Sequence, residues 1–256
     1  MGFYTVSLAI RKNEDLVRMK KILLSVIILF VASSTAVAAY HSDFVVFSLI
    51  KFSDFEEIEK DIFVSPDTTS KQRVELLELV KNAKTRIRQK FGAFTASPII
   101  ISSHNINWRK KYTNNSYADA ILLPFKNNKA YIFIGENGHN LDVVAHELVH
   151  AEVFSYVGYI NQLLEIPIWF NEGIAMQVDF RERYNAPLKS QKELSQLKYG
   201  WQFFKGNSNE LTAHYSIAKN EVNNWLNHTQ KLSLNKFLKK LNNGKNFDDL
   251  YNETNN

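Results

Sequence analysis

Residues 146–150 read His146-Glu147-Leu148-Val149-His150, and this pentapeptide constrains the fold more than any other part of the chain. Two histidines four residues apart can reach one metal ion if the segment is helical, because residues i and i+4 lie on one helix face. Glu147 then lies beside the metal, where it can hold and deprotonate a water molecule. The pattern predicts a helix with His146 and His150 as ligands of one Zn²⁺ and Glu147 as general base.

The segment around the motif has the pattern of a buried helix. Asn140 is the expected N-cap, and Asp142 lies in the first turn, where the helix dipole favours negative charge. Apolar residues recur at the spacing of a core stripe, and more of them lie on the histidine side. The two sets are Leu141, Val144, Ala145, Leu148 and Val149, and Val143, Val153 and Phe154. A helix that is apolar on both flanks packs inside the protein.

A catalytic zinc ion takes three protein ligands and leaves one position for water, so a third ligand is needed. The metzincin continuation of the motif is excluded, because Val153 stands where that pattern has Gly and Tyr156 where it has His. The remaining candidates are the carboxylates that follow the motif. They are Glu152, Glu165, Glu172, Asp179 and Glu182.

Glu172 is the expected third ligand. It lies early in an apolar run of residues 166–178, and Pro167 suits the start of a helix there. Gly173 removes a side chain where this second helix could press closely on the first. Glu152, by contrast, points away from the histidine face. A carboxylate buried among apolar residues requires a partner such as a metal ion.

The motif, together with residues 169–175 (WFNEGIA), resembles the gluzincin branch of zinc metallopeptidases, specifically the peptidase MA-like or minigluzincin type. The resemblance covers roughly residues 95–252. It implies that His146, His150 and Glu172 bind zinc and that Glu147 is the general base. In gluzincins a Tyr or His of the C-terminal tail commonly stabilises the oxyanion. Tyr215 is therefore the expected second catalytic residue, with His214 as the alternative.

One position departs from the related thermolysin-like pattern. Those enzymes carry an Asp four residues after the glutamate ligand, where it orients a zinc-bound histidine, and this chain has Met176 there. The partner that orients a zinc ligand is therefore open among three residues. They are Asn171, Asp142 and Asp179.

Residues 1–38 are expected to be a signal peptide, with Met19 as the true start. Lys20 and Lys21 precede an apolar run at residues 22–31, and small residues follow up to Ala38. An uncleaved membrane anchor is the alternative, although the apolar core is too short to span a bilayer. Cleavage after Ala38 predicts an exported protein, periplasmic or extracellular, without stable membrane insertion.

The composition narrows the chemistry further. The chain has no cysteine, which excludes thiolate ligands and requires a core that is stable without disulfides. Removing residues 1–38 takes away five basic and two acidic residues, so the formal charge falls from +5 to about +2. Nothing in this balance favours nucleic acid as a partner, and a peptide or protein substrate is expected.

We expect a zincin-like α+β fold. It has a small N-terminal mixed or antiparallel sheet with packed helices, then the motif helix, the glutamate helix and an all-helical C-terminal part. Residues 39–94 form an N-terminal extension and a first helix, residues 95–256 form the metallopeptidase domain, and the two make one compact unit. Residues 39–66 are either a packed extension, with a short strand at 44–50, or an inhibitory pro-segment.

Local patterns place the other elements. Thr68 and Thr69 cap a helix that ends at Gly92, and strands are expected at residues 98–102, 118–123 and 130–135. Residues 108–116 read as an exposed loop. The resemblance implies that residues 131–134 are the edge strand against which substrate lies. Helices are expected at residues 190–205, from a cap at Thr212, and at 233–244.

The sequence therefore favours a zinc-dependent peptidase, and an endopeptidase among these. Two alternatives remain open: a zinc-binding envelope or assembly protein that cleaves nothing, and a zinc hydrolase that acts on a non-peptide amide of the cell wall. Glu147 argues against the first, because a purely structural site needs ligands but no base.

Overall fold

The computed structural model describes residues 23–27, 46–113, 119–124, 129–184, 194–228 and 233–255. Residues 47–256 form one compact unit and residues 1–46 another, of which the described part is the short helix at 23–27 and residue 46. The expected signal peptide and its cleavage position lie otherwise outside the described residues. Within these ranges, no helix is both long enough and apolar enough to cross a membrane.

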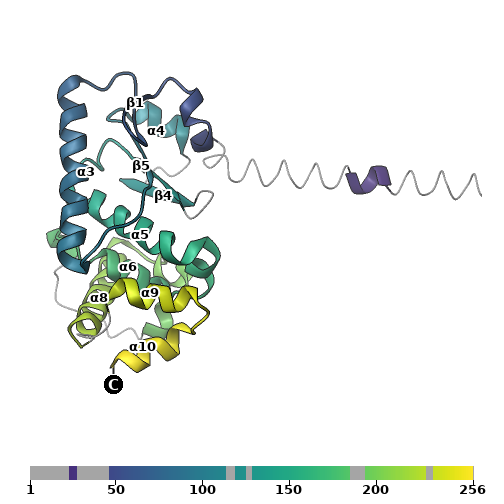
Figure 1. The fold of residues 1–256 in the computed structure, drawn as a ribbon, viewed down its shortest axis with the longest axis vertical. Coiled ribbons are helices and arrows are strands. Elements are labelled where there is room, and N and C mark those ends of the chain that lie inside the picture. The colour runs from purple at the N-terminus through teal and green to yellow at the C-terminus, as the bar shows by residue number, and fades with distance from the viewer. Residues whose placement is uncertain are drawn as a thin grey trace, which may run out of the picture. The chain divides into compact units, whose positions relative to one another are not determined.

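A five-stranded mixed sheet forms the N-terminal half of the larger unit (Figure 1). The strand order is β1-β2-β3-β5-β4, in which β2, β3 and β5 are parallel and both outer strands are antiparallel to their neighbours. The strands are β1 (Glu56–Glu59), β2 (Ile62–Val64), β3 (Ile99–Ser102), β4 (Ala120–Pro124) and β5 (Ala130–Ile134). An α+β fold with a small mixed sheet is thus confirmed, as are the three predicted strands.

The strand order corrects one prediction. Residues 131–134 were expected at the edge of the sheet, but β5 lies between β3 and β4, so its backbone is paired on both sides. The edge on this side is β4 instead. All five residues of β5 are buried, so both of its faces are covered, and its continuous apolar run is the pattern of a central strand.

Each face of the sheet is covered by helices. One face packs against α3 (Ser70–Phe91) and α5 (Leu141–Leu164). The other is covered by an aromatic group in which Phe47 lies 5.7 Å from Phe133 and 6.0 Å from Tyr131, ring centre to ring centre. The 3-10 helix η1 (Ile50–Phe52) and α4 (Ile106–Tyr112) belong to this layer. The sheet therefore has no solvent-facing side over its central strands.

Two predictions for this half were wrong. Residues 46–48, expected as part of a strand, are helical. Residues 56–64 form the β1–β2 hairpin, whose charged outer strand faces solvent as an edge strand can. The expected exposed loop at residues 108–112 is part of α4, because Asn105 caps it and Tyr112 packs 5.0 Å from the Phe55 ring.

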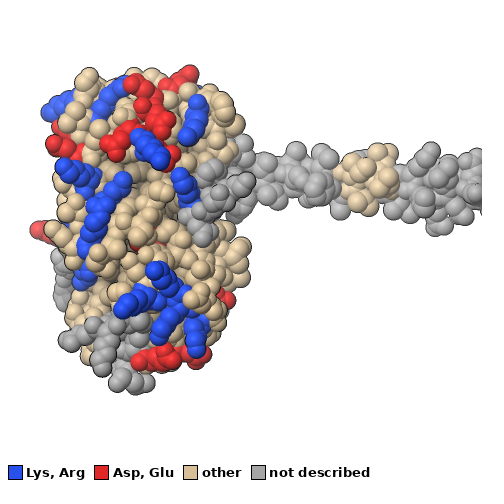
Figure 2. Space-filling model, in the orientation of Figure 1, with Lys and Arg blue, Asp and Glu red and all other residues tan. Residues whose placement is uncertain are grey.

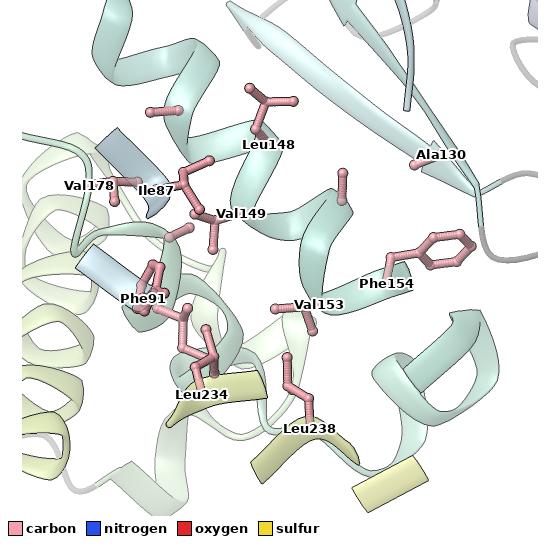
Figure 3. Packing of buried hydrophobic residues seen from close by; sticks show 14 of the residues in the cluster. Ile87, Phe91, Ala130, Leu148, Val149, Val153, Phe154, Val178, Leu234 and Leu238 are labelled. Atoms are coloured by element: carbon pink, nitrogen blue, oxygen red, sulfur yellow. The ribbon is translucent and has the colours of Figure 1, made fainter. Parts of the chain in front are cut away.

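Helices α3 and α5 form as the sequence predicts. Thr69 makes a capping box with Gln72, and Gly92 ends α3 in the left-handed conformation with φ of 86°. The Asn140 side chain accepts a hydrogen bond from the backbone N–H of Val143 at 2.9 Å and caps α5. Figure 3 shows apolar side chains of α5 within one cluster with those of α3 and α9 (Leu234–Asn242).

The C-terminal half is helical (Figure 1). Phe170 lies at the centre of its aromatic core, with ring centres 5.0 Å from Trp225 and 4.9 Å from Phe247. The predicted helix at 233–244 is confirmed as α9, whereas Thr212 lies inside α8 and does not cap it. Only α7 and η4 form in the described part of residues 190–205. The elements are α6 (Ile168–Ala175), η3 (Glu182–Tyr184), η4 (Leu194–Leu197), α7 (Gly200–Phe203), α8 (Ser208–His228) and α10 (Phe247–Asn255).

Gly173 allows close helix packing, but the neighbour differs from the one expected. A Cβ atom at this position would lie 2.5 Å from the Ala218 carbonyl oxygen and 2.5 Å from Val222 Cγ2. Both belong to α8, so Gly173 lets α8 approach α6, while α5 approaches α6 on another side. The absence of a side chain at Gly173 thereby sets how closely α6, which carries Glu172, packs against α8.

Candidate metal centre

Three predicted ligands converge although they come from two helices. His146 and His150 of α5 lie with their Nε2 atoms 3.1 Å apart. Glu172 Oε2, from α6, lies 3.3 Å from the Nε2 atom of His146 and 3.5 Å from that of His150. All three side chains are buried, and among the described residues they form the one group of three potential metal ligands.

The spacing of these atoms fits a zinc ion. Two bonds of about 2.1 Å at a tetrahedral angle separate the donor atoms by about 3.4 Å, close to the three distances observed. Glu172 Oε2 is buried and has no hydrogen-bond partner, which is costly for a carboxylate oxygen unless a cation satisfies it. Two imidazoles and one carboxylate are also a donor set that zinc prefers, and they would leave a position for water.

The other carboxylates considered as ligands lie elsewhere. Glu152 accepts hydrogen bonds from the backbone N–H groups of Thr95 and Ala96, at 2.8 and 2.7 Å, on the side of α5 away from the histidines. Glu165 is the exposed C-cap of α5, and Glu182 is exposed in η3. Asp179 lies close to the site but behind His146.

Two of the three candidate orienting residues contact the histidines. Asp179 Oδ2 lies 3.5 Å from His146 Nδ1, an ion-pair contact that is longer than a good hydrogen bond. Asn171 Oδ1 lies 3.4 Å from His150 Nδ1 and also accepts a hydrogen bond from Gln162 Nε2 at 3.2 Å. In each case the ring nitrogen opposite the metal-facing one has a polar neighbour, which favours Nε2 as the ligand atom.

Asp142, the third candidate, contacts residues 178–180, the segment that contains Asp179. It pairs with Arg86 of α3 and accepts the backbone N–H of Phe180 at 3.2 Å. Arg86 also donates to the Val178 carbonyl oxygen at 2.8 Å. Asp142 therefore acts on the centre through the backbone of residues 178–180.

Arg181 is a further residue of the centre, one that periodicity and motif spacing did not indicate. Its guanidinium donates hydrogen bonds to the fully buried Asp179, with Nε 2.9 Å from Oδ1 and 3.0 Å from Oδ2. Arg181 Nη1 lies 3.8 Å from Asp119, which immediately precedes β4. The only trace of this in the sequence is an arginine two residues after an aspartate, which is too common to be a guide.

The charges around His146 are strongly coupled. Burial by itself would lower the pKa of His146, but the carboxylates of Asp179 and Glu172 outweigh it and raise that pKa to about 10. Burial would raise the pKa of Glu172, but both histidines hold it well below its usual range. The metal-free centre at neutral pH therefore holds a protonated His146 between two carboxylates.

Glu147 faces an open cleft beside the ligands. Burial raises its pKa, while the neighbouring histidines oppose the rise. The cleft has a volume of about 320 Å³ and lies between β4 and helices α5, α6 and α8. Its lining comprises Ala120, Ile121, Leu122, His146, Glu147, His150, Gln162, Asn171, Glu172 and Tyr215. A carboxylate with a raised pKa beside such a cleft is suited to accept a proton.

Tyr215 and His214 face different environments. The Tyr215 ring lines the cleft and lies 6.4 Å from the His146 ring, and burial raises the pKa of its hydroxyl, which therefore remains a donor at neutral pH. His214 is buried outside the cleft lining, and its Nδ1 donates to the Phe203 carbonyl oxygen at 2.6 Å. The structure thus brings Tyr215, and not His214, to the centre.

Comparison with known protein families, with curated proteins and with solved structures finds no match for this chain.

Proposed function

We propose that this protein is a zinc-dependent peptidase, an endopeptidase of the gluzincin type with a zincin-like arrangement of its helices. The observation that carries the proposal is the convergence of His146, His150 and Glu172, with donor atoms 3.1–3.5 Å apart, next to Glu147 in an open cleft. Zinc held there would supply Lewis acidity, which lowers the pKa of water and polarises a carbonyl group.

The chain's own residues have distinct roles in this scheme. Glu147 accepts a proton from the attacking water and later donates it to the leaving amine. The Tyr215 hydroxyl donates a hydrogen bond to the substrate carbonyl oxygen as negative charge develops on it. The outer edge of β4, which pairs with no other strand in the described part of the chain and whose residues 120–122 line the cleft, binds an extended peptide through backbone hydrogen bonds.

Export belongs to the same proposal. Lys20 and Lys21, the apolar run at residues 22–31 and the small residues up to Ala38 support a signal peptide that is removed. Sequencing the N-terminus of the protein recovered from expressing cells tests this directly. A mature chain that begins after Ala38 is expected, and one that retains residues 22–31 would favour an anchor.

The catalytic proposal is tested with Glu147→Gln. We expect the wild type to bind about one zinc ion per chain and to cut a peptide library at internal positions. Glu147→Gln should keep its zinc and lose cleavage by about a thousandfold or more, because the base is lost while the ligands remain. Metal analysis and mass spectrometry of the digest measure the two properties. Glu165→Gln, the same change at the exposed end of α5, is the matched control.

Two results would overturn the scheme. Peptide cleavage retained by Glu147→Gln would remove Glu147 from its role. A wild type that binds zinc but cuts no peptide would instead favour a zinc-binding envelope protein or a hydrolase of non-peptide amides. Release of products from cell-wall material would distinguish the second of these from the first.

A further inference from the structure

The last turns of α5 turn their apolar side chains outward. Gly158, with φ of 73° and ψ of 169°, interrupts the helix and begins a separate segment that ends at Leu164. Gln162 points inward from this segment and donates to Asn171 at the metal centre. A helix of a globular protein normally buries its apolar face, and here the arrangement is reversed. The side chains that are 46–68% exposed are Tyr159, Ile160, Leu163 and Leu164.

A second exposed apolar segment surrounds α7. Tyr199, Trp201 and Phe204 are 52%, 72% and 49% exposed, and the rings of Tyr199 and Trp201 stack with centres 6.3 Å apart. Lys198 and Lys205 flank these aromatic residues. Aromatic side chains next to lysines are typical of segments that lie at a membrane–water interface.

The two segments are neighbours. The backbone N–H of Ile168, four residues after Leu164, donates to the Lys198 carbonyl oxygen at 2.9 Å. This contact places the residues before α7 beside the first residue of α6, four residues after the α5 segment ends. We call the seven exposed side chains together the apolar rim. They are Tyr159, Ile160, Leu163, Leu164, Tyr199, Trp201 and Phe204.

Exposed lysines border the apolar rim. Helix α9 packs against α5, and Lys239 Nζ lies 5.9 Å from the ring centre of Tyr156, which lies just before the interruption of α5 at Gly158. Figure 2 shows a group of blue side chains in the region where Figure 1 places α9. The exposed lysines of this helix are Lys236, Lys239 and Lys240.

Acidic residues offset part of this charge. Asp248 lies 3.7 Å from Lys198, and Glu253 lies 3.8 Å from Lys240. Glu165 is exposed at the end of α5. Within the described part of the chain, no carboxylate lies within ion-pair distance of the three other lysines. These are Lys205, Lys236 and Lys239.

A peptide in the metal cleft does not account for the apolar rim. Gln162 lies on the cleft side of its segment, and residues two positions away point to the opposite helix face. Ile160 and Leu164 therefore face away from the cleft and need a partner outside it. A partner that combines an apolar interior with negative surface charge matches both the exposed side chains and the lysines.

We propose that the apolar rim and its lysines dock onto an anionic phospholipid surface. Ile160, Leu164 and Trp201 enter the boundary between headgroups and acyl chains, and the lysines contact the phosphate groups. Gln162 lies on the opposite face of the same helical segment and lines the cleft beside His146, His150 and Glu172. Docking therefore holds this cleft close to the bilayer. The docking does not depend on catalysis, so its failure and the failure of the proposed peptidase activity are separate results.

The test is co-sedimentation of the full chain with vesicles. Every protein carries Val26→Glu and Ile27→Glu, so that the N-terminal apolar run does not itself enter the bilayer. Vesicles of phosphatidylglycerol with phosphatidylcholine are compared with vesicles of phosphatidylcholine alone. We expect binding to the anionic vesicles, weakened by at least about tenfold in the pair Leu164→Ser and Trp201→Ser.

Two further variants make the result specific. The pair Phe52→Ser and Val74→Ser removes side chains that are 88% and 58% exposed elsewhere on the unit, and binding should be unchanged. The pair Lys205→Gln and Lys236→Gln should weaken binding to anionic vesicles by about tenfold or more, without affecting the core. This pair keeps the test valid if the apolar substitutions disturb folding, which circular dichroism would detect.

Three results would overturn docking to lipid. One is the absence of binding to anionic vesicles. Another is equal binding by the lysine pair, the apolar-rim pair and the Phe52/Val74 control. The third is a dimer in gel filtration that the apolar-rim pair converts to a monomer, without vesicle binding, because the rim would then be covered by a second copy of the chain.

Discussion

His146 lies between two buried carboxylates, and its protonation would control the binding of a metal ion at this centre. Asp179 and Glu172 raise the pKa of His146 to about 10, above the usual value of 6.5 for histidine. A metal ion binds only the neutral ring, so at neutral pH it must displace this proton. The same carboxylates that orient and complete the centre therefore make metal binding compete with protons.

The apparent affinity for zinc should accordingly rise with pH. Below a pKa of about 10, the neutral fraction of His146 increases about tenfold per pH unit, so affinity should increase similarly between pH 6.5 and 9. Competition with a metal indicator at fixed free zinc measures this. Asp179→Asn removes a principal cause of the raised pKa, and its curve should level off at lower pH. A wild-type affinity that is flat over this range would contradict the assignment.

Glu172 makes a second prediction at the residue scale. Glu172→Gln replaces the carboxylate ligand by a neutral amide of the same size, and zinc affinity should fall by at least about a hundredfold. Equilibrium dialysis against zinc is the measurement. Glu165→Gln, which changes a carboxylate seven residues earlier in the chain but exposed to solvent, should retain full zinc binding. Equal loss in both variants would show that overall charge, and not ligation, controls the affinity.

At the scale of elements, the position of α6 depends on its contact with α8. The Gly173 position has no room for a side chain, since a Cβ would lie 2.5 Å from a backbone oxygen of α8. Helix α6 carries Glu172 beside this contact. A small displacement of α6 would therefore move the glutamate ligand relative to the two histidines of α5.

Gly173→Ala should destabilise the protein by about 2 kcal/mol or more and also weaken zinc binding, because the two helices must separate. Urea unfolding and zinc titration measure the two effects. Gly200→Ala in α7 is the control, since its nearest neighbour would lie 3.7 Å from the new Cβ, an ordinary contact. We expect that control to change stability by less than about 1 kcal/mol. An unchanged Gly173→Ala protein would mean that the helices can move apart at no cost.

Single elements were also where sequence reasoning succeeded and failed most clearly. The N-caps at Thr69 and Asn140 were predicted correctly, because a cap is a hydrogen bond between residues three apart. The position of residues 131–134 in the sheet was wrong, because strand neighbours are chosen by contacts between distant segments. Helix α4 was missed because the side chains that stabilise it pack against Phe55, far away in the sequence.

At the scale of the whole molecule, Glu152 connects α5, which carries the two histidines, to the segment that leads into the sheet. Its buried carboxylate, on α5, accepts hydrogen bonds from the backbone of Thr95 and Ala96, between α3 and β3, and from the Thr95 hydroxyl at 3.0 Å. The connection fixes α5 against the chain segment that enters the central parallel strand. It therefore couples the position of the histidines to the N-terminal half.

Glu152→Ala should lower the free energy of unfolding by about 3 kcal/mol, since it leaves two backbone N–H groups without their acceptor. Thermal and urea unfolding of the metal-free protein measure this, so that any change in metal binding does not enter. Glu165→Ala removes an exposed carboxylate from the same helix and should have little effect. A stability loss of equal size in both variants would point to helix propensity, and not to the hydrogen bonds.

The sequence by itself determined what depends on neighbours along the chain. The spacing of His146 and His150 predicted one helix face, and the apolar surroundings predicted its burial, because helical periodicity is a local property. The burial of Glu172 was also predicted from its neighbours. Pro167, Gly173 and the apolar run also led to the hypothesis that Glu172 lies on a second helix and meets the two histidines, which the resemblance supported, and the structure brings these ligand atoms together.

Only the tertiary structure decided what depends on packing between distant segments. It placed Asp179 and Arg181 behind His146, made β4 the edge of the sheet, and turned the apolar side of residues 159–164 outward. None of these follows from spacing, since each requires knowing which surfaces meet once the chain is folded. The chemistry of the ligands is thus local in origin, whereas their charge environment and access to partners arise from the fold.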